Sequence, residues 1–162
     1  MRVLYKGLGV VFIALAWLGS VSLALLISDR VPPLTYEGAR ALQSSVPQGG
    51  AIDVEFEVYR TKICPSTVRR YLVDADDVQH AITNYTVGSN SKKGREVYQR
   101  TITVPQNAAV GPAIYFVRLE YICNLAQQLG WPIKVESPPV PFRVTAAVSM
   151  VPFGLPPPGE GD

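Results

Sequence analysis

The sequence predicts an all-β domain, built as an antiparallel sandwich of two sheets, behind one N-terminal transmembrane helix. Residues 7–27 form an apolar run that contains no charged side chain. After it come roughly seven short segments rich in β-branched and aromatic residues, with turn residues about every eight to twelve positions. This spacing is typical of β-sandwiches. No long amphipathic helical pattern follows the apolar run.

The apolar run matches a bilayer in length. At about 1.5 Å of rise per residue, a helix over residues 7–27 spans roughly 30 Å, the thickness of the hydrocarbon core. Arg2 and Lys6 precede the run, whereas Asp29 and Arg30 nearly cancel after it. The positive-inside rule then predicts a cytoplasmic N-terminus. We expect a single-pass protein of the inner (plasma) membrane whose C-terminal domain is periplasmic or otherwise extracytoplasmic.

A cleaved signal peptide is the alternative, because it also begins with basic residues. Its apolar region is usually about 7–15 residues long and ends in an Ala-x-Ala-like site. The run in this chain is longer, and Ser22-Leu23-Ala24 matches such a site poorly. We therefore expect the segment to be kept as a signal-anchor.

One face of the predicted helix carries small residues. Ala16, Ser20 and Ala24 recur every four positions and would permit close packing against a second membrane helix. The alternative is that alanine and serine are common in any membrane anchor.

Composition divides the chain into five parts. Proline and glycine interrupt the region after the helix and the C-terminal tail, whereas the part between them alternates between apolar and polar residues. We expect a cytoplasmic N-terminus, a membrane helix, a spacer, a sandwich domain and a Pro/Gly-rich tail, over residues 1–6, 7–27, 28–50, 51–145 and 146–162. Within the spacer, residues 34–36 could add an edge strand and residues 38–43 could form a short helical turn.

Residues 51–64 have the pattern of a half-buried strand. A period of two places four apolar side chains on one face, those of Ile52, Val54, Phe56 and Val58. Arg60 and Lys62 fall on the same face as these apolar residues, so either a bulge intervenes or this end of the strand extends beyond the core. Residues 67–73 form the next predicted strand. Because few residues separate the two strands, we expect them to form a hairpin.

The second half of the domain contains the most regular segment. Residues 113–123 keep apolar side chains on one parity and are only partly polar on the other, which predicts a central strand. A single helical turn is expected within residues 124–130. Prolines interrupt residues 133–144, and because proline cannot donate to a β-ladder, the last strand should be an edge strand or be broken in two.

Three acidic residues crowd one turn. Asp74, Asp76 and Asp77 could hold a calcium ion, but the glycine and the distal glutamate of an EF-hand loop are missing. We expect a solvated turn.

The strand pattern resembles an immunoglobulin-like or fibronectin type III-like β-sandwich. The resemblance rests on Val104-Pro105, on the Gly-Pro-Ala-Ile-Tyr run that ends at Tyr115, and on the two cysteines. It covers residues 50–145 and implies a tyrosine corner at Tyr115. The chain departs from antibody-type domains because Trp131 follows the second cysteine. A fold of this kind does not define an activity.

The two cysteines are expected to form a disulfide. Cys64 and Cys123 each end a predicted strand, so both can reach the same end of a sandwich. An exported chain meets an oxidising compartment, where such a pair is normally bridged. The alternative is an envelope metal-binding chaperone of the copper type, in which the two thiols act with His80 or Met150. No Cys-x-Cys, Cys-x-x-Cys or His-x-His spacing supports it.

Catalysis has no support in the sequence, although an anchored hydrolase is the third hypothesis. His80 is the only histidine, and neither Gly-x-Ser-x-Gly nor His-Glu-x-x-His occurs. We predict no catalytic residue, no metal and no cofactor.

The predicted role is binding of a protein partner at the cell envelope, in a bacterial or phage-encoded accessory protein. The net charge of +2 does not indicate nucleic-acid binding. Lys92, Lys93 and Arg95 make one loop basic and suit an anionic partner such as lipid headgroups, unless they form an ordinary solvated loop. Trp131 is the candidate aromatic anchor for a partner, with a place in the core as its alternative.

Overall fold

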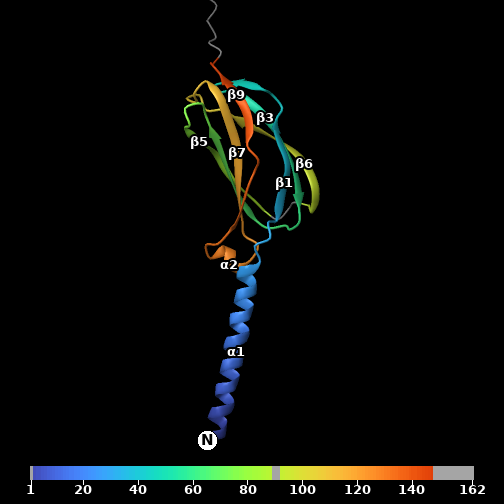
Figure 1. Ribbon diagram of the computed structural model, residues 1–162, viewed down its shortest axis with the longest axis vertical. Helices are drawn as coiled ribbons and strands as arrows, with labels where there is room; N and C mark the ends of the chain where they lie inside the picture. The colour runs from blue at the N-terminus through green and yellow to red at the C-terminus, as the bar shows by residue number, and fades with distance from the viewer. Residues whose placement is uncertain (1, 89–91, 148–162) are drawn as a thin grey trace, which may run out of the picture.

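The computed structural model describes residues 2–88 and 92–147 (Figure 1). Helix α1 (Arg2–Ser28) is longer than the predicted run 7–27 and extends away from the β domain as a separate rod. None of its segment Val11–Ser28 is buried against the rest of the described chain. Pro32 and Pro33 follow shortly after Ser28, and the chain cannot continue as a helix through them.

Two sheets form the β domain. Every pair of neighbouring strands is antiparallel except β2 with β9, which is parallel. The three-stranded sheet has the order β1 (Leu34–Ala41), β3 (Ala51–Arg60), β6 (Gly94–Thr103). The larger sheet has the order β2 (Ser45–Pro47), β9 (Val140–Thr145), β7 (Gly111–Tyr121), β4 (Ser66–Val73), β5 (Gln79–Val87), and β8 (Ile133–Glu136) also pairs with β7.

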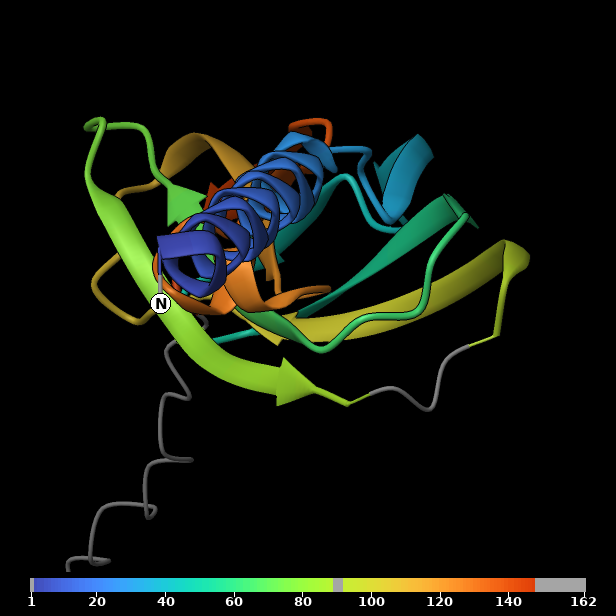
Figure 2. The ribbon, with the colours of Figure 1, turned by 90° about the horizontal axis from the view of Figure 1, so that it is seen from below.

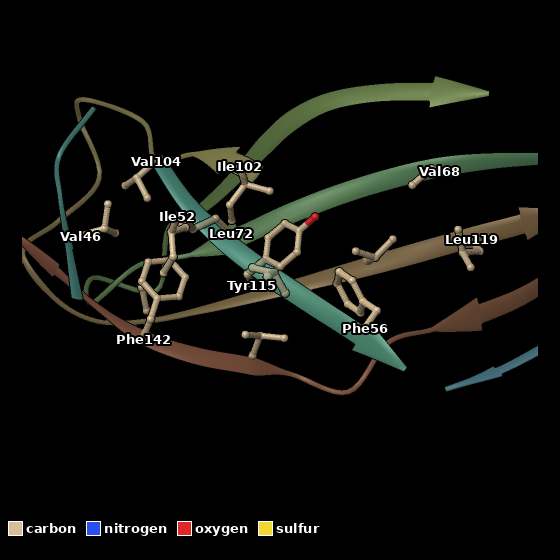
Figure 3. Packing of buried hydrophobic residues seen from close by; sticks show 14 of the residues in the cluster. Val46, Ile52, Phe56, Val68, Leu72, Ile102, Val104, Tyr115, Leu119 and Phe142 are labelled. Atoms are coloured by element: carbon tan, nitrogen blue, oxygen red, sulfur yellow. The ribbon is translucent and has the colours of Figure 1, made fainter. Parts of the chain in front are cut away.

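The sheets enclose one hydrophobic core, to which both contribute every second residue (Figure 3). The alternation predicted for β3 is confirmed, because Ile52, Val54 and Val58 are 0% exposed. On β7, alternate side chains from Ala113 to Tyr121 are buried as well. Burial of these side chains is the main source of the domain's stability.

The prediction of a spacer over residues 28–50 is wrong, because two strands lie within it. Leu34 is 2% exposed and begins β1, which pairs with β3 along its whole length. A register shift between Tyr36 and Gly38 changes the alternation, so that Ala39 packs against the core. The bulge and the small residues after it hide the period of two from a reading of the sequence. The β domain therefore begins near Leu34 and not at residue 51.

The predicted hairpin between residues 51–64 and 67–73 is also wrong. The connection through Cys64 and Pro65 carries the chain from one sheet to the other, so β3 pairs with β1 and β6, whereas β4 pairs with β5 and β7. Both strands have an apolar face, and the two faces meet across the core. Short separation in sequence therefore does not make these strands neighbours in a sheet.

Other predictions for the second half of the domain are confirmed. Strand β7 is central, because β4 pairs with it on one side and β8 and β9 pair with it on the other. The last predicted strand is broken in two at residues 137–139, two of which are prolines. The expected helical turn is α2 (Leu125–Gln128).

Candidate functional site

The two cysteines meet at the end of the β domain that adjoins α1. Cys64 lies between β3 and β4, Cys123 follows β7, and their sulfur atoms are bonded at 2.02 Å. The pairing predicted from the sequence is therefore present. It joins the connection between the sheets to the end of the central strand of the larger sheet.

This disulfide argues against the thiol-based metal centre. Neither cysteine is free. His80 lies near the opposite end of β4, where its Nε2 is 2.7 Å from Asp74 Oδ2. Within residues 2–88 and 92–147, no cluster of three or more His, Cys, Asp or Glu side chains could hold a metal ion. Met150, the other ligand considered, lies outside the described residues.

Asp74 organises the turn after β4 and is not solvated, which corrects the prediction for this residue. Its side chain is 2% exposed. One carboxylate oxygen accepts the N–H groups of Asp76 and Val78, and the other accepts the N–H of Ala109 and contacts His80. These bonds, led by that from Ala109, hold the pKa of Asp74 well below its usual range.

Polar contacts tie the end of α1 to the β domain. Asn124 Nδ2 donates to the carbonyl oxygen of Leu26 at 3.0 Å, and Gln127 Nε2 donates to that of Asp29 at 3.0 Å. Lys62 Nζ lies 2.6 Å from the Asp29 carboxylate. Because Asn124 is also the N-cap of α2, the short helix is held at the level of the last turn of α1.

Large apolar side chains are exposed around α2. We call this region the base, and we define it as α2 with Ile122, Leu129 and Trp131. Figure 2 views the domain from this end, with α1 in front of it. Leu125, Leu129 and Trp131 are 69%, 78% and 57% exposed, respectively. Trp131 is therefore not a core residue, and the alternative that placed it in the core is wrong. An apolar group of this kind typically marks a contact surface.

The predicted basic loop lies at the same end of the domain. Gly94, the first residue of β6, pairs with Arg60, the last residue of β3. Arg60 in turn pairs with Leu34, the first residue of β1, which follows α1 after a short connection. Lys92 and Lys93 directly precede Gly94, and both are exposed. The structure thus places these two lysines and Trp131 at the α1 end.

Arg95 differs from its two basic neighbours. Its Nε lies 2.7 Å from the carboxylate of Glu37 and 3.4 Å from that of Glu57, so two acids offset its charge. Its availability to an anionic partner is correspondingly low. The three small residues of α1, Ala16, Ser20 and Ala24, are exposed, and their packing against a second helix stays a prediction.

A second candidate site is a cleft between the two sheets, which we call the inter-sheet cleft. Its volume is about 100 Å³. The edge strands β5 and β6 both contribute to its walls, and β1, β3, β4 and β7 complete it. Four of its lining residues are charged, namely Arg60, Arg70, Arg100 and Glu96.

Each of the three arginines lies two positions along its strand from a residue that is buried in the core, and so shares that residue's face of the sheet. Arg60 follows buried Val58, Arg70 lies between buried Val68 and Leu72, and Arg100 precedes buried Ile102, each at a spacing of two. Strand β3 keeps its register with β6 through Arg60, so no bulge turns that side chain outward. The parity of Arg60 was visible in the sequence, whereas the meeting of the three arginines was not.

Two buried polar atoms in the cleft, the Tyr115 hydroxyl and Arg60 Nε, have no hydrogen-bond partner among the described residues. Tyr115 is 0% exposed, and in Figure 3 its hydroxyl oxygen points away from Phe142. The predicted tyrosine-corner bond is therefore not made. Burial raises the pKa of Tyr115, and the charge of Arg70 opposes this rise.

Comparisons with known proteins add little to this geometry. No family model matches the sequence, and no curated protein matches it. Among solved structures, the alkylpurine DNA glycosylase AlkC of Pseudomonas fluorescens, bound to DNA containing an abasic site analog, is similar at 11% identity and a TM-score of 0.42. The match covers 70% of this chain and 31% of that chain, so this chain spans under a third of the glycosylase. A likeness this weak carries no functional argument.

Proposed function

We propose that this chain is a single-pass envelope protein with a retained N-terminal anchor, and that its exported β domain lies against the outer surface of the membrane. The domain is of the immunoglobulin-like class and acts without catalysis, by binding a protein partner. The host is a bacterium, or a phage encodes the chain as an accessory protein. The base carries this proposal, because its exposed apolar side chains lie level with the end of an unburied apolar helix.

The uncovered surface of α1 supports the anchor. Phe12 and Trp17 are 70% and 71% exposed in the described chain. Exposure of so many large apolar side chains to water is unfavourable, and lipid tails remove this cost. The bonds from Asn124 and Gln127 to Leu26 and Asp29 hold the C-terminal end of α1 against the β domain.

The chemistry of the base suits the boundary between lipid headgroups and tails. Tryptophan is enriched at this depth because its ring is apolar and its indole N–H is polar. Leu125 and Leu129 would insert beside it, and Lys92 and Lys93 would attract anionic headgroups at the rim. Each lysine near an anionic surface contributes roughly 1 kcal/mol.

Two measurements test the retained anchor. The first is the intact mass of the protein extracted from membranes, which should include residues 1–28 at the N-terminus. The second is cell fractionation, in which a carbonate wash should leave the chain in the membrane pellet. A soluble product that lacks the helix would contradict the proposal.

Fluorescence quenching tests the contact of the base with lipid. The chain has two tryptophans, so Trp17→Phe leaves Trp131 as the only one. In vesicles with brominated acyl chains, we expect strong quenching of Trp131 and a blue-shifted emission. The matched control carries Trp17→Phe, Trp131→Phe and Val110→Trp, because Val110 is 54% exposed and lies beside the turn of Asp74, at the far end of the domain. Equal quenching of both proteins would refute the proposed orientation.

Photo-crosslinking in intact cells tests the partner. A photoreactive residue at Thr83, on the edge strand β5, should capture a specific protein. The matched position is Thr35 on β1, which is an edge strand of the three-stranded sheet. The same captured species at both positions, or none at either, would count against a partner at the β5 edge.

A further inference from the structure

We propose that the inter-sheet cleft binds a carboxylate group, supplied by an acidic side chain of a protein partner or by a small free acid. Three arginines and one glutamate line the cleft, so it carries an excess of positive charge. Two unpaired buried polar atoms, the arrangement of the arginines and the size of the cleft support a carboxylate.

The unpaired donors are the first observation. A buried polar atom without a hydrogen bond is costly, so native proteins rarely leave one without a partner. The cleft has two such atoms, the hydroxyl oxygen of Tyr115 and Nε of Arg60. Arg60 can only donate, and a tyrosine hydroxyl donates readily. A group that satisfies Arg60 must therefore accept hydrogen bonds, and an acceptor also suits the Tyr115 hydroxyl.

Arg70 is held in place before any ligand arrives. Nε and one terminal nitrogen of Arg70 donate to the Thr83 carbonyl at 2.9 Å and 2.6 Å, and its guanidinium lies 5.3 Å from the centre of the Tyr85 ring. The Arg70 guanidinium also lies close enough to the Tyr115 hydroxyl to act on its pKa. A guanidinium fixed in this way loses little entropy when it binds a carboxylate.

The remaining charges leave the site positive. A terminal nitrogen of Arg60 lies 3.3 Å from Glu96, which is a long contact, and the Glu96 side chain is 47% exposed. Arg100 lies 5.2 Å from the centre of the Tyr98 ring and makes no ion pair within the described residues. An anionic group would thus meet Arg60, whose charge Glu96 partly offsets, and Arg70 and Arg100, which have no acidic partner within the described residues.

The size of the cleft selects a small group. A volume of about 100 Å³ is equivalent to about three water molecules at their share of the liquid. Drug-sized ligands occupy roughly 300–1,000 Å³. A single carboxylate fits, and an acidic side chain can enter from a partner strand that lies along β5 or β6, because both are edge strands of their sheets.

The experiment is a titration of the ¹⁵N-labelled full-length chain in detergent micelles, with the side-chain Nε–H signals of Arg60 and Arg70 as reporters. The probes are acetate, the capped tripeptide Ala-Glu-Ala and its neutral match Ala-Gln-Ala, all at constant ionic strength set with sodium chloride. We expect saturable shifts with Ala-Glu-Ala and none with Ala-Gln-Ala or with added chloride. Saturation by acetate as well would indicate that a free acid suffices, and saturation by the peptide alone would indicate a protein side chain.

Two variants connect the shifts to the cleft. Tyr115→Phe removes only a hydroxyl that has no partner, so the domain should keep its fold while binding weakens roughly tenfold. Arg70→Gln should weaken binding at least as much. The control is Arg40→Gln, because Arg40 pairs with Glu55 at 2.6 Å and is not part of the cleft. Unchanged affinity in Tyr115→Phe, equal shifts with chloride, or equal shifts with Ala-Gln-Ala would overturn the proposal.

This inference rests on the proposed partner binding only for the origin of the carboxylate. The titration does not require a retained helix, so a cleaved N-terminus would refute the membrane proposal and leave the cleft untouched. A retained helix without carboxylate binding would refute the cleft alone.

Discussion

Asp74→Asn is expected to destabilise the β domain substantially although it changes only one atom type. The side chain of Asp74 is 2% exposed and accepts three backbone N–H groups, at 3.0, 3.1 and 2.9 Å. One asparagine oxygen can still serve Asp76 and Val78. The amide nitrogen that replaces the other oxygen cannot accept the N–H of Ala109.

The expected cost follows from these contacts. A buried N–H that loses its acceptor costs roughly 1–3 kcal/mol, and a neutral acceptor binds about half as strongly as a charged one. The loss at Ala109 and the weaker bonds at Asp76 and Val78 together amount to about 3 kcal/mol. For a domain of about 110 residues this lowers Tm by roughly 10 °C.

The effect should also depend on pH. The folded-state pKa of Asp74 lies below that of the unfolded chain, so its contribution is complete above about pH 4 and is lost as pH falls toward the folded-state pKa. The difference in Tm between wild type and Asp74→Asn should therefore be largest at pH 7 and smaller at pH 3.

The assay is thermal unfolding of the full-length chain in detergent, followed by circular dichroism at both pH values. Asp76→Asn is the matched control, because Asp76 is exposed and its carboxylate makes no hydrogen bond within the described residues. It should melt within about 2 °C of wild type. If Asp74→Asn also melts that close to wild type at pH 7, or if its deficit is the same at pH 3, then the turn does not depend on this carboxylate.

Three further predictions concern the bridge, the base and the cleft. The double variant Cys64→Ser, Cys123→Ser should lose about 4 kcal/mol, because the bridge spans 59 residues; a guanidinium titration measures this, and a loss below about 1 kcal/mol would contradict it. When the disulfide of the wild-type protein is intact, iodoacetamide should add no mass unless the protein is first reduced. Leu125→Ser with Leu129→Ser should leave Tm within about 2 °C of wild type, because both side chains are exposed, while reducing the quenching of Trp131 by brominated lipid. Tyr115→Phe should keep or slightly raise Tm, since its hydroxyl has no partner to lose, and a drop of more than about 5 °C would reveal a hydrogen bond that the structure lacks.

Much of the fold was predictable because its signals are local. The long apolar run indicates a helix wherever it lies, and the alternation in β3 and β7 depends only on neighbouring residues. The break between β8 and β9 follows from the prolines themselves. The cysteine pairing was accessible for another reason, since a chain with two cysteines has only one possible intramolecular bridge.

Strand order was less accessible. The nearness of β3 and β4 in sequence suggested a hairpin, but their apolar faces meet across the core and their edges pair with other strands. Only residues 34–36 of β1 were recognisable as a possible edge strand, because the bulge between Tyr36 and Gly38 interrupts the alternation that identifies a strand. In both cases the deciding contacts are with residues distant in sequence.

The sequence by itself determined the N-terminal apolar helix, most strands, the core faces and the disulfide, because each depends on residue chemistry or on local spacing. Only the tertiary structure decided that Leu125 and Trp131 lie level with the end of α1, and that Arg60, Arg70 and Tyr115 line one cleft. These groups come from different strands and connections. Their meeting depends on how two sheets pack, which no local pattern encodes.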